Sequence, residues 1–340
     1  KRLFQQTLVT ESPKRQRLAW VDYAKGFGIF LVVLGHTIRA LINSSILEKS
    51  TIFKFVDEWI YAFHMPLFFF LSGLFVCRAA SKPLRDFIVS RLNIIIYPYL
   101  VWSILQSLLQ SMGSGYTNNQ TSLIELWKII YQPVMQFWFL YTLFILVLIY
   151  TILQKRGVSP MGFLIFSIFI YAIYVFGINF SFWGVLYSAQ RYAIYLAIGA
   201  VFGSGKLMSS LSKIKTQIWL IILIGGFLAV ALGVSFNLLT GGLTRFLVAL
   251  FGISASVALA IILERLGKTP FVKEWGCLSL EIYLAHVIAA AIFRILLQKV
   301  LGITEPIAHL FLGTMVGIYL PIALNIICQR IGFRYMFRLV

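Results

Sequence analysis

The chain has 340 residues, of which 60% are hydrophobic and only 12% are charged. Soluble domains carry charge on about a quarter of their residues, so this composition excludes a soluble globular fold and indicates a polytopic membrane protein. The net charge of +18 would suggest nucleic-acid binding in a soluble protein. In a membrane protein, topology and contact with anionic lipids account for such an excess, so membrane lipids are expected partners and nucleic acid is not.

Apolar runs predict an all-α fold with about ten transmembrane helices. The runs cover residues 22–42, 59–77, 92–110, 133–153, 160–178, 184–203, 216–235, 243–263, 275–298 and 306–328. The polar stretches outside them are too short for a separate soluble domain, which needs about 50 residues. We therefore expect a basic tail at 1–20, one transmembrane domain at 21–330 and a second tail at 331–340.

The distribution of charge predicts the orientation of the chain. Most of the 29 Lys and Arg residues fall in the two tails and in the even-numbered loops, whereas the odd-numbered loops hold Lys49, Lys54, Lys128, Arg245 and Lys299. Positive charge accumulates on the cytoplasmic side of membrane proteins, so both termini are expected to be cytoplasmic. The expected location is a bacterial inner membrane or plasma membrane.

The first apolar run contains the strongest functional signal, Lys25 and His36. Eleven residues bring a helix back to within roughly 20° of its starting direction and advance it by about 16 Å, so the two side chains share one face. Ionisable groups at bilayer depth are expensive and indicate function. We assign His36 to catalysis and Lys25 to the anionic end of a ligand. Asp22, three residues before Lys25, is expected to pair with it and to belong to the catalytic group.

The second apolar run contains His64, Ser72 and Gly73. A Ser-Gly pair allows a thin ligand to approach the backbone, so Ser72 and Gly73 are expected to contact the cofactor. For His64 two interpretations stay open, acceptor binding or a single structural hydrogen bond. The glycine pairs Gly199/Gly203 and Gly313/Gly317 are instead typical of helix packing.

Three arginines are candidates for binding phosphate, because the arginine fork binds phosphate bidentately. Arg85 and Arg91 end the most basic cytoplasmic loop, 78–91, although a role as a topology marker also explains Arg85. Arg191 precedes an apolar run and is expected to be buried.

The ninth run places an acid and a histidine, Glu281 and His286, in one helix. Five residues separate their directions by about 140°, so they cannot face one point. His286 is expected to meet His36 or the substrate, and Glu281 is expected to pair with Arg191.

The sequence lacks the signatures of metal and nucleotide sites. There is no Gly-Lys-Ser nucleotide loop, no His-Glu-x-x-His and no acid-rich cluster, so no metal is expected. Cys77, Cys277 and Cys328 are odd in number and dispersed, which does not indicate a disulfide framework.

Five segments, in order along the chain, resemble the acyltransferase-3 family of integral membrane acyltransferases. They are DYAKGFGIFLVVLGH at 22–36, FHMPLFFFLSG at 63–73, RLNIIIYPYL at 91–100, FWFLYTLF at 137–144 and SLEIYLAH at 279–286. Within this family the chain is most similar to stand-alone members of the fucose 4-O-acetylase-like type.

The resemblance implies transfer of an acetyl group from cytoplasmic acetyl-CoA to a hydroxyl of a cell-surface or exported glycan or of a lipid-linked saccharide. It places the first-helix basic residue and histidine of the family on Lys25 and His36, and the third-helix arginine on Arg91. A second arginine of that helix is replaced here by Asn93 or Ile94, and Arg85 is expected to substitute for it. The acceptor is assigned to His64, Trp138, Glu281 and His286.

Some relatives continue into an extracytoplasmic esterase-like domain. This chain stops soon after its tenth run, so we expect it to act alone, as a homo-oligomer or with a separate delivery partner.

Three alternatives stay open at this point. A transporter of a glycan or lipid-linked precursor can use the same intramembrane charges, and a membrane scaffold can carry them without function. A covalent product distinguishes an enzyme from both. For an enzyme, His36 acts either as a general base or as a transient acyl carrier, and the acyl group is acetyl or a larger group.

Overall fold

The structure is a computed structural model that describes residues 18–112, 123–205 and 207–339. Every regular element in these residues is helical, which confirms the all-α prediction. The α-helices are α2 (Ala19–Asn43), α3 (Thr51–Gly73), α4 (Val76–Ala80), α5 (Leu84–Arg91), α6 (Tyr97–Met112), α7 (Trp138–Lys155), α8 (Pro160–Val175), α9 (Gly184–Ser204), α10 (Leu207–Ser210), α11 (Thr216–Ser235), α12 (Gly242–Leu266), α13 (Pro270–Cys277), α14 (Ser279–Ile295) and α15 (Pro306–Arg330).

Eight helical stretches of the described chain are long and apolar enough to cross a membrane, so the protein is a polytopic membrane protein. They are α2, Leu84–Met112, Leu126–Lys155, α9, α11, α12, Ser279–Val300 and α15. The other two predicted runs correspond to α3, which carries Lys54, Asp57 and Glu58 in its first half, and to α8, which has only 16 residues. The total of ten spans and the cytoplasmic termini therefore stay predictions.

Several helix boundaries differ from the predicted ones. Helix α3 begins at Thr51 rather than at residue 59, because the Ser50 side chain caps it by accepting a hydrogen bond from the Phe53 amide at 3.3 Å. Helix α5 joins α6 through a wide π-helical turn at Leu92–Ile96. The ninth predicted run is divided at Leu278 into α13 and α14.

The predicted runs leave the connection 111–132 between the third and fourth helices. Within it, residues 113–122 lie outside the described residues, and Leu123–Ile130 forms a 3-10 helix that contacts α6.

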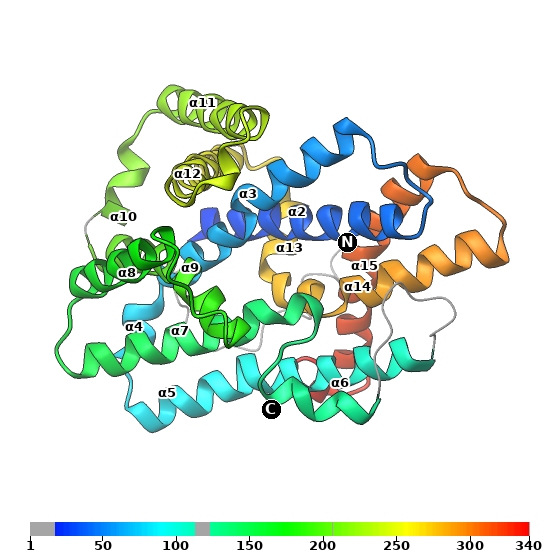
Figure 1. Ribbon diagram of the computed structural model, residues 1–340, viewed down its shortest axis with the longest axis horizontal. Coiled ribbons are helices and arrows are strands. Elements are labelled where there is room, and N and C mark those ends of the chain that lie inside the picture. The colour runs from blue at the N-terminus through cyan, green and yellow to red at the C-terminus, as the bar shows by residue number, and fades with distance from the viewer. Residues whose placement is uncertain (1–17, 113–122, 206, 340) are drawn as a thin grey trace.

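Helix α2 runs through the middle of the bundle and packs against α3, α12, α13, α14 and α15 (Figure 1). Its contact with α13 is a backbone contact made possible by glycine. A Cβ atom on Gly276 would lie 1.7 Å from the Asp22 carbonyl oxygen, and one on Gly26 would lie 1.9 Å from the Val272 carbonyl oxygen. No other residue fits at either position, so α13 fixes the first turns of α2.

Helices α3 and α9 approach each other in the same way. A Cβ on Gly199 would lie 2.1 Å from the Phe70 carbonyl oxygen, and one on Gly203 would lie 2.0 Å from that of Leu74, which confirms the packing role predicted for this pair. The ligand contact predicted for Gly73 is wrong, because α9 fills the space beside it. The neighbouring Ser72 hydroxyl donates to its own helix, to the Phe68 carbonyl oxygen at 2.8 Å.

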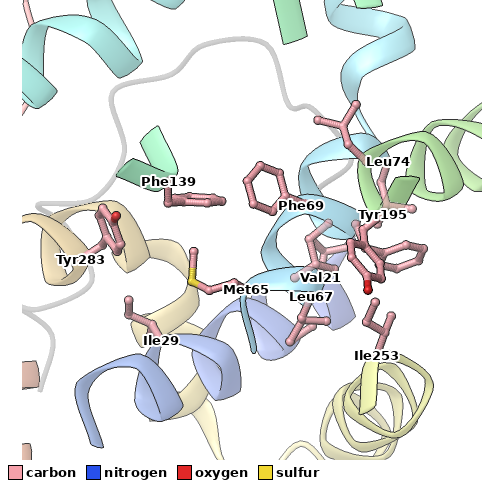
Figure 2. Close-up of a cluster of buried hydrophobic side chains, with 14 of the residues drawn as sticks. Val21, Ile29, Met65, Leu67, Phe69, Leu74, Phe139, Tyr195, Ile253 and Tyr283 are labelled. Atoms are coloured by element: carbon pink, nitrogen blue, oxygen red, sulfur yellow. The ribbon is translucent and has the colours of Figure 1, made fainter. Parts of the chain in front are cut away.

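An aromatic cluster in the core joins α3, α7 and α14. The ring centres of Phe69 and Phe139 lie 4.9 Å apart, and those of Phe139 and Tyr283 lie 5.7 Å apart. Figure 2 shows these rings together with Met65 of α3 and Ile29 of α2. Interiors of this kind are closely packed and resist displacement of one helix against another. The cluster therefore holds α14 in register with α2 and α3.

We predict that Gly199→Ala destabilises the fold by about 1–3 kcal/mol, the usual cost of forcing an extra carbon into a packed interface. The measurement is the thermal unfolding midpoint of the purified protein in detergent. Gly225→Ala is the matched control, because Gly225 also lies inside a spanning helix but has nothing within 4 Å of its Cβ position. Equal midpoints for the two variants would contradict the close contact between α3 and α9.

Candidate functional site

The structure brings two histidines from helices far apart in the sequence into direct contact. His36 of α2 is half-buried and His286 of α14 is buried. The Nδ1 atom of His36 lies 2.8 Å from the Nε2 atom of His286, and the two rings are stacked with their centres 5.0 Å apart. His286 was predicted to contact either His36 or the substrate, and in the structure it contacts His36.

The hydrogen bonds of this pair define where the protons lie when both rings are neutral. The Nδ1 atom of His286 faces the carbonyl oxygens of Tyr283 at 2.8 Å and of Ile282 at 3.1 Å. Carbonyl oxygens only accept, so this nitrogen carries a proton and the Nε2 atom of His286 is an acceptor. His36 then donates from Nδ1, which leaves its Nε2 atom with a lone pair. That nitrogen is the one available for chemistry.

His36 and His286 open into a cavity of about 340 Å³, which we call the histidine cavity. Its wall is formed by the second halves of α2, α6 and α14 and by Met135. The lining residues besides the two histidines are Thr37, Arg39, Ala40, Asn43, Gln106, Leu109, Gln110, Met135, Val287, Ile288, Ala290, Ala291, Ile292, Arg294 and Ile295. Most of them are aliphatic. A ligand can therefore reach the catalytic candidate in a largely apolar setting, which strengthens polar interactions within it.

Arg39, one turn beyond His36 on α2, forms the polar border of this cavity. Its Nε and Nη2 atoms donate to the two carboxylate oxygens of Asp57 at 2.7 and 2.8 Å. Its guanidinium carbon also lies 3.2 Å from the ring centre of Tyr61, whose ring centre is 6.3 Å from that of His36. Sequence reasoning gave Arg39 no role. Its position three residues after His36, on a neighbouring face, was the available signal.

The basic residues predicted to bind the cofactor lie away from the histidine pair. Lys25 is about 16 Å along α2 from His36. Helix α5, which carries Arg85 and Arg91, packs against α4 and α7 rather than α2. Arg85 is exposed, and the Arg91 guanidinium lies 5.4 Å from the ring centre of Phe87. Neither the histidine cavity nor the second cavity described below is lined by these three residues.

Asp22 does not join the histidine pair. Fourteen residues of α-helix place it about 21 Å from His36 along α2, so its assignment to the same catalytic group is wrong. The predicted pair with Lys25 is also wrong. The two ion pairs within the described residues join Arg39 to Asp57 and Lys54 to Glu58.

Arg191 lies in a different place from the one predicted. Its guanidinium carbon is 5.4–5.6 Å from the ring centres of Tyr174, Tyr187 and Tyr192. It lines a second cavity, of about 400 Å³, which it shares with Arg39. Arg191 was predicted to bind the cofactor, and the structure places it in this second cavity rather than in the histidine cavity.

Of the other acceptor candidates, none lines either cavity. The expected ion pair of Glu281 with Arg191 is not formed, and Glu281 interacts electrostatically with Arg338 instead. His64 is 1% exposed, and its Nδ1 atom donates to the Ile60 carbonyl oxygen at 2.8 Å. This is the alternative of a single structural hydrogen bond. Trp138 packs with its ring centre 5.3 Å from that of Tyr192, behind the wall of the second cavity.

A family model described as an acyltransferase domain matches residues 18–326. The chain belongs to the acyltransferase-3 family. The matched range contains the histidine pair and every residue that lines the two cavities of this acyltransferase. Comparison with curated proteins gives no match, and comparison with solved structures gives none either. Within the residues that the structure describes, no group of three or more His, Cys, Asp or Glu side chains is placed to hold a metal ion.

We predict that His36 exists as the tautomer with its proton on Nδ1. The measurement is the nitrogen NMR spectrum of protein labelled only at histidine, with the His36 signals assigned from a His36→Gln sample. His286→Phe keeps a ring of similar shape but removes the acceptor, so the proton of His36 should redistribute to Nε2. An unchanged His36 spectrum in the His286→Phe protein would contradict the hydrogen bond between the two rings.

Proposed function

We propose that this acyltransferase moves an acetyl group from cytoplasmic acetyl-CoA to a hydroxyl group of a glycan at the outer face of a bacterial membrane. The observation that carries the proposal is the His36 ring, which lines a cavity while His286 holds its Nδ1 atom, so that its Nε2 atom is left for chemistry. The family supports acyl transfer. The choice of acetyl and of a glycan rests on the similarity of the sequence motifs to fucose 4-O-acetylase-like members.

The donor is proposed to bind with its phosphates at the Lys25 end of the bundle. Coenzyme A carries several phosphate charges, which suit the Arg85 and Arg91 forks and the Lys25 ammonium. The pantetheine arm then has to run about 16 Å along α2 to His36. Because neither cavity is lined by the three basic residues, the proposal includes a passage that opens beside α2 when the donor binds.

His36 performs the transfer by one of two routes. As a general base, its Nε2 atom takes the proton of the acceptor hydroxyl while that oxygen bonds to the thioester carbon. The carbon–sulfur bond breaks, and the proton passes to the leaving thiolate. As a nucleophile, Nε2 itself forms the bond to the acetyl carbon and the thiolate leaves. In a second step the acceptor hydroxyl displaces the imidazole, and its proton passes to the thiolate. Both routes use the lone pair on the Nε2 atom of His36.

His286 is a positioning residue for either route. It fixes the tautomer of His36, and it accepts the Nδ1 proton more strongly as positive charge develops on the His36 ring. A histidine oriented by a hydrogen-bond acceptor behind it is the arrangement used in catalytic triads. Here two backbone carbonyl oxygens hold the second ring.

The transporter alternative has no support from the family, whose described activity is acyl transfer. Action as a homo-oligomer or with a separate delivery partner stays compatible with the proposal. Membrane lipids surround the exposed apolar side chains of α8 and α11 in this proposal.

We predict that His36→Ala abolishes acetyl transfer while the protein is still expressed and folded, although loss of the partner of His286 lowers its thermal stability. Both routes need the Nε2 lone pair, and loss of a general base or nucleophile costs at least 100-fold in rate. The measurement is transfer of labelled acetyl from acetyl-CoA to glycan in membranes. Near-normal transfer by the variant would refute the assignment of His36.

We predict that Lys25→Ala and Arg91→Ala each raise the apparent KM for acetyl-CoA about tenfold or more, because each removes a charge-assisted contact to phosphate. The turnover number should change less. Lys213→Ala is the control, since Lys213 is an exposed lysine in a loop predicted to face the same side. A KM that is equally raised in the control, or unchanged in both variants, would place the nucleotide elsewhere.

A further inference from the structure

The second cavity lies where six helices meet. Its walls come from the end of α2, α3 as far as Pro66, the ends of α8 and α11, the beginnings of α9 and α12, and the α11–α12 connection. We call it the arginine–tyrosine cavity, after Arg39, Arg191, Arg245, Tyr61, Tyr171 and Tyr192 in its lining. Its volume of about 400 Å³ is in the range of small-molecule sites.

The charges around this cavity do not balance. Asp57 is occupied by its two hydrogen bonds with Arg39, and Glu58 lies 3.8 Å from Lys54. Arg191 and Arg245 form no ion pair with any residue that the structure describes. Both are half-buried, and a cation held in such a place favours an anionic partner.

The two arginines are held in position rather than loose. The Nε atom of Arg245 donates to the Leu239 carbonyl oxygen at 2.7 Å, which leaves its terminal nitrogens for other partners. Arg191 sits among three tyrosine rings at 5.4–5.6 Å, a geometry that orients a guanidinium without neutralising it. Both guanidinium groups are also within Coulombic range of Tyr171 and Tyr192. Their positive charges therefore act on the same small volume.

The remaining wall suits a sugar. Tyrosine offers an apolar face together with a hydroxyl that donates and accepts hydrogen bonds, the combination that matches a pyranose ring. An arginine fork adds bidentate binding of a carboxylate or phosphate. A saccharide that carries an oxyanion satisfies both parts of the wall, whereas a neutral sugar leaves the two cations without a partner.

The cavity also adjoins the catalytic candidate. Arg39 lines both cavities, and Tyr61 of this wall lies 6.3 Å from His36 between ring centres. A ligand bound in this cavity would contact Tyr61 and Arg39, the residues that lie next to the His36 ring. An acyl acceptor needs such proximity to the reacting group.

We propose that the arginine–tyrosine cavity binds the anionic group of an acidic acceptor saccharide, with Arg191 and Arg245 as the residues that hold the oxyanion. That the bound saccharide is the acyl acceptor rests on the proposed function. Binding itself does not depend on acetyl transfer.

The test measures binding without the donor, using the full chain in nanodiscs of phosphatidylcholine. The probes are oligogalacturonate and its fully methyl-esterified form, whose carboxyl groups carry a methyl group and no charge, and glucose 6-phosphate against glucose. Titration calorimetry should show that at least one acidic probe binds at least tenfold more tightly than its neutral counterpart, with a Kd that rises with salt. The two pairs distinguish carboxylate from phosphate as the preferred anion.

Variants locate the binding. Arg191→Gln and Arg245→Gln should each weaken binding of the acidic probe about tenfold or more, the effect of losing a charged hydrogen bond, and leave neutral probes unchanged. Arg191→Lys, which keeps the charge but not the fork, serves if Arg191→Gln unfolds. Arg156→Gln is the matched control, since Arg156 is exposed and lines neither cavity.

Three results overturn the inference. The first is no preference for either acidic probe, and the second is equal weakening of binding by Arg156→Gln. The third is loss of probe binding when phosphatidylglycerol replaces phosphatidylcholine, which would assign the cavity to a lipid headgroup. Acidic probes that bind as expected but are never acetylated would refute the proposed function and leave this inference standing. Acetylation of a neutral glycan by a protein that does not bind the acidic probes would refute this inference and leave the proposed function standing.

Discussion

The site depends on one hydrogen bond in an apolar bundle, between the Nδ1 atom of His36 and the Nε2 atom of His286. A polar ring nitrogen without a partner costs several kcal/mol in such surroundings, so each imidazole needs the other. This requirement sets the separation of α2 and α14. The aromatic cluster around Phe139 and Tyr283 then holds α14 in place from behind. Helix α15 contributes from the far side, where a Cβ on Gly317 would lie 2.7 Å from a Val33 methyl carbon.

The position of the histidine pair divides the molecule into two unlike ends. Both cavities adjoin the half of α2 that follows His36, and Lys25, Arg85 and Arg91 line neither of them. In the proposed reaction the donor and the acceptor therefore approach the same imidazole from opposite sides of the bilayer. The acetyl group alone crosses the middle. This division suits a reaction whose charged donor cannot leave the cytosol.

Much of this arrangement was predictable where it depends on one helix. The eleven-residue spacing predicted that His36 lies deep on α2, and the apolar runs predicted most of the helices. What lies between helices was not predictable, because periodicity defines the face of a helix but not its neighbour. A glycine such as Gly73 allows close approach of either a ligand or another helix, and the sequence does not show that the neighbour is α9. Arg191 was expected to pair with Glu281, because nothing in its local sequence shows that three tyrosines surround it. His286 was placed correctly only as one of two choices.

The wide turn at Leu92–Ile96 has a mechanical consequence. A π-helical turn contains one residue more than regular α geometry, so it offsets everything after it by about 100°. Gln106 and Gln110, which follow this turn on α6, line the histidine cavity. The geometry of the turn therefore sets which residues of α6 belong to the wall of that cavity, so a one-residue insertion or deletion at Leu92–Ile96 would present other side chains there.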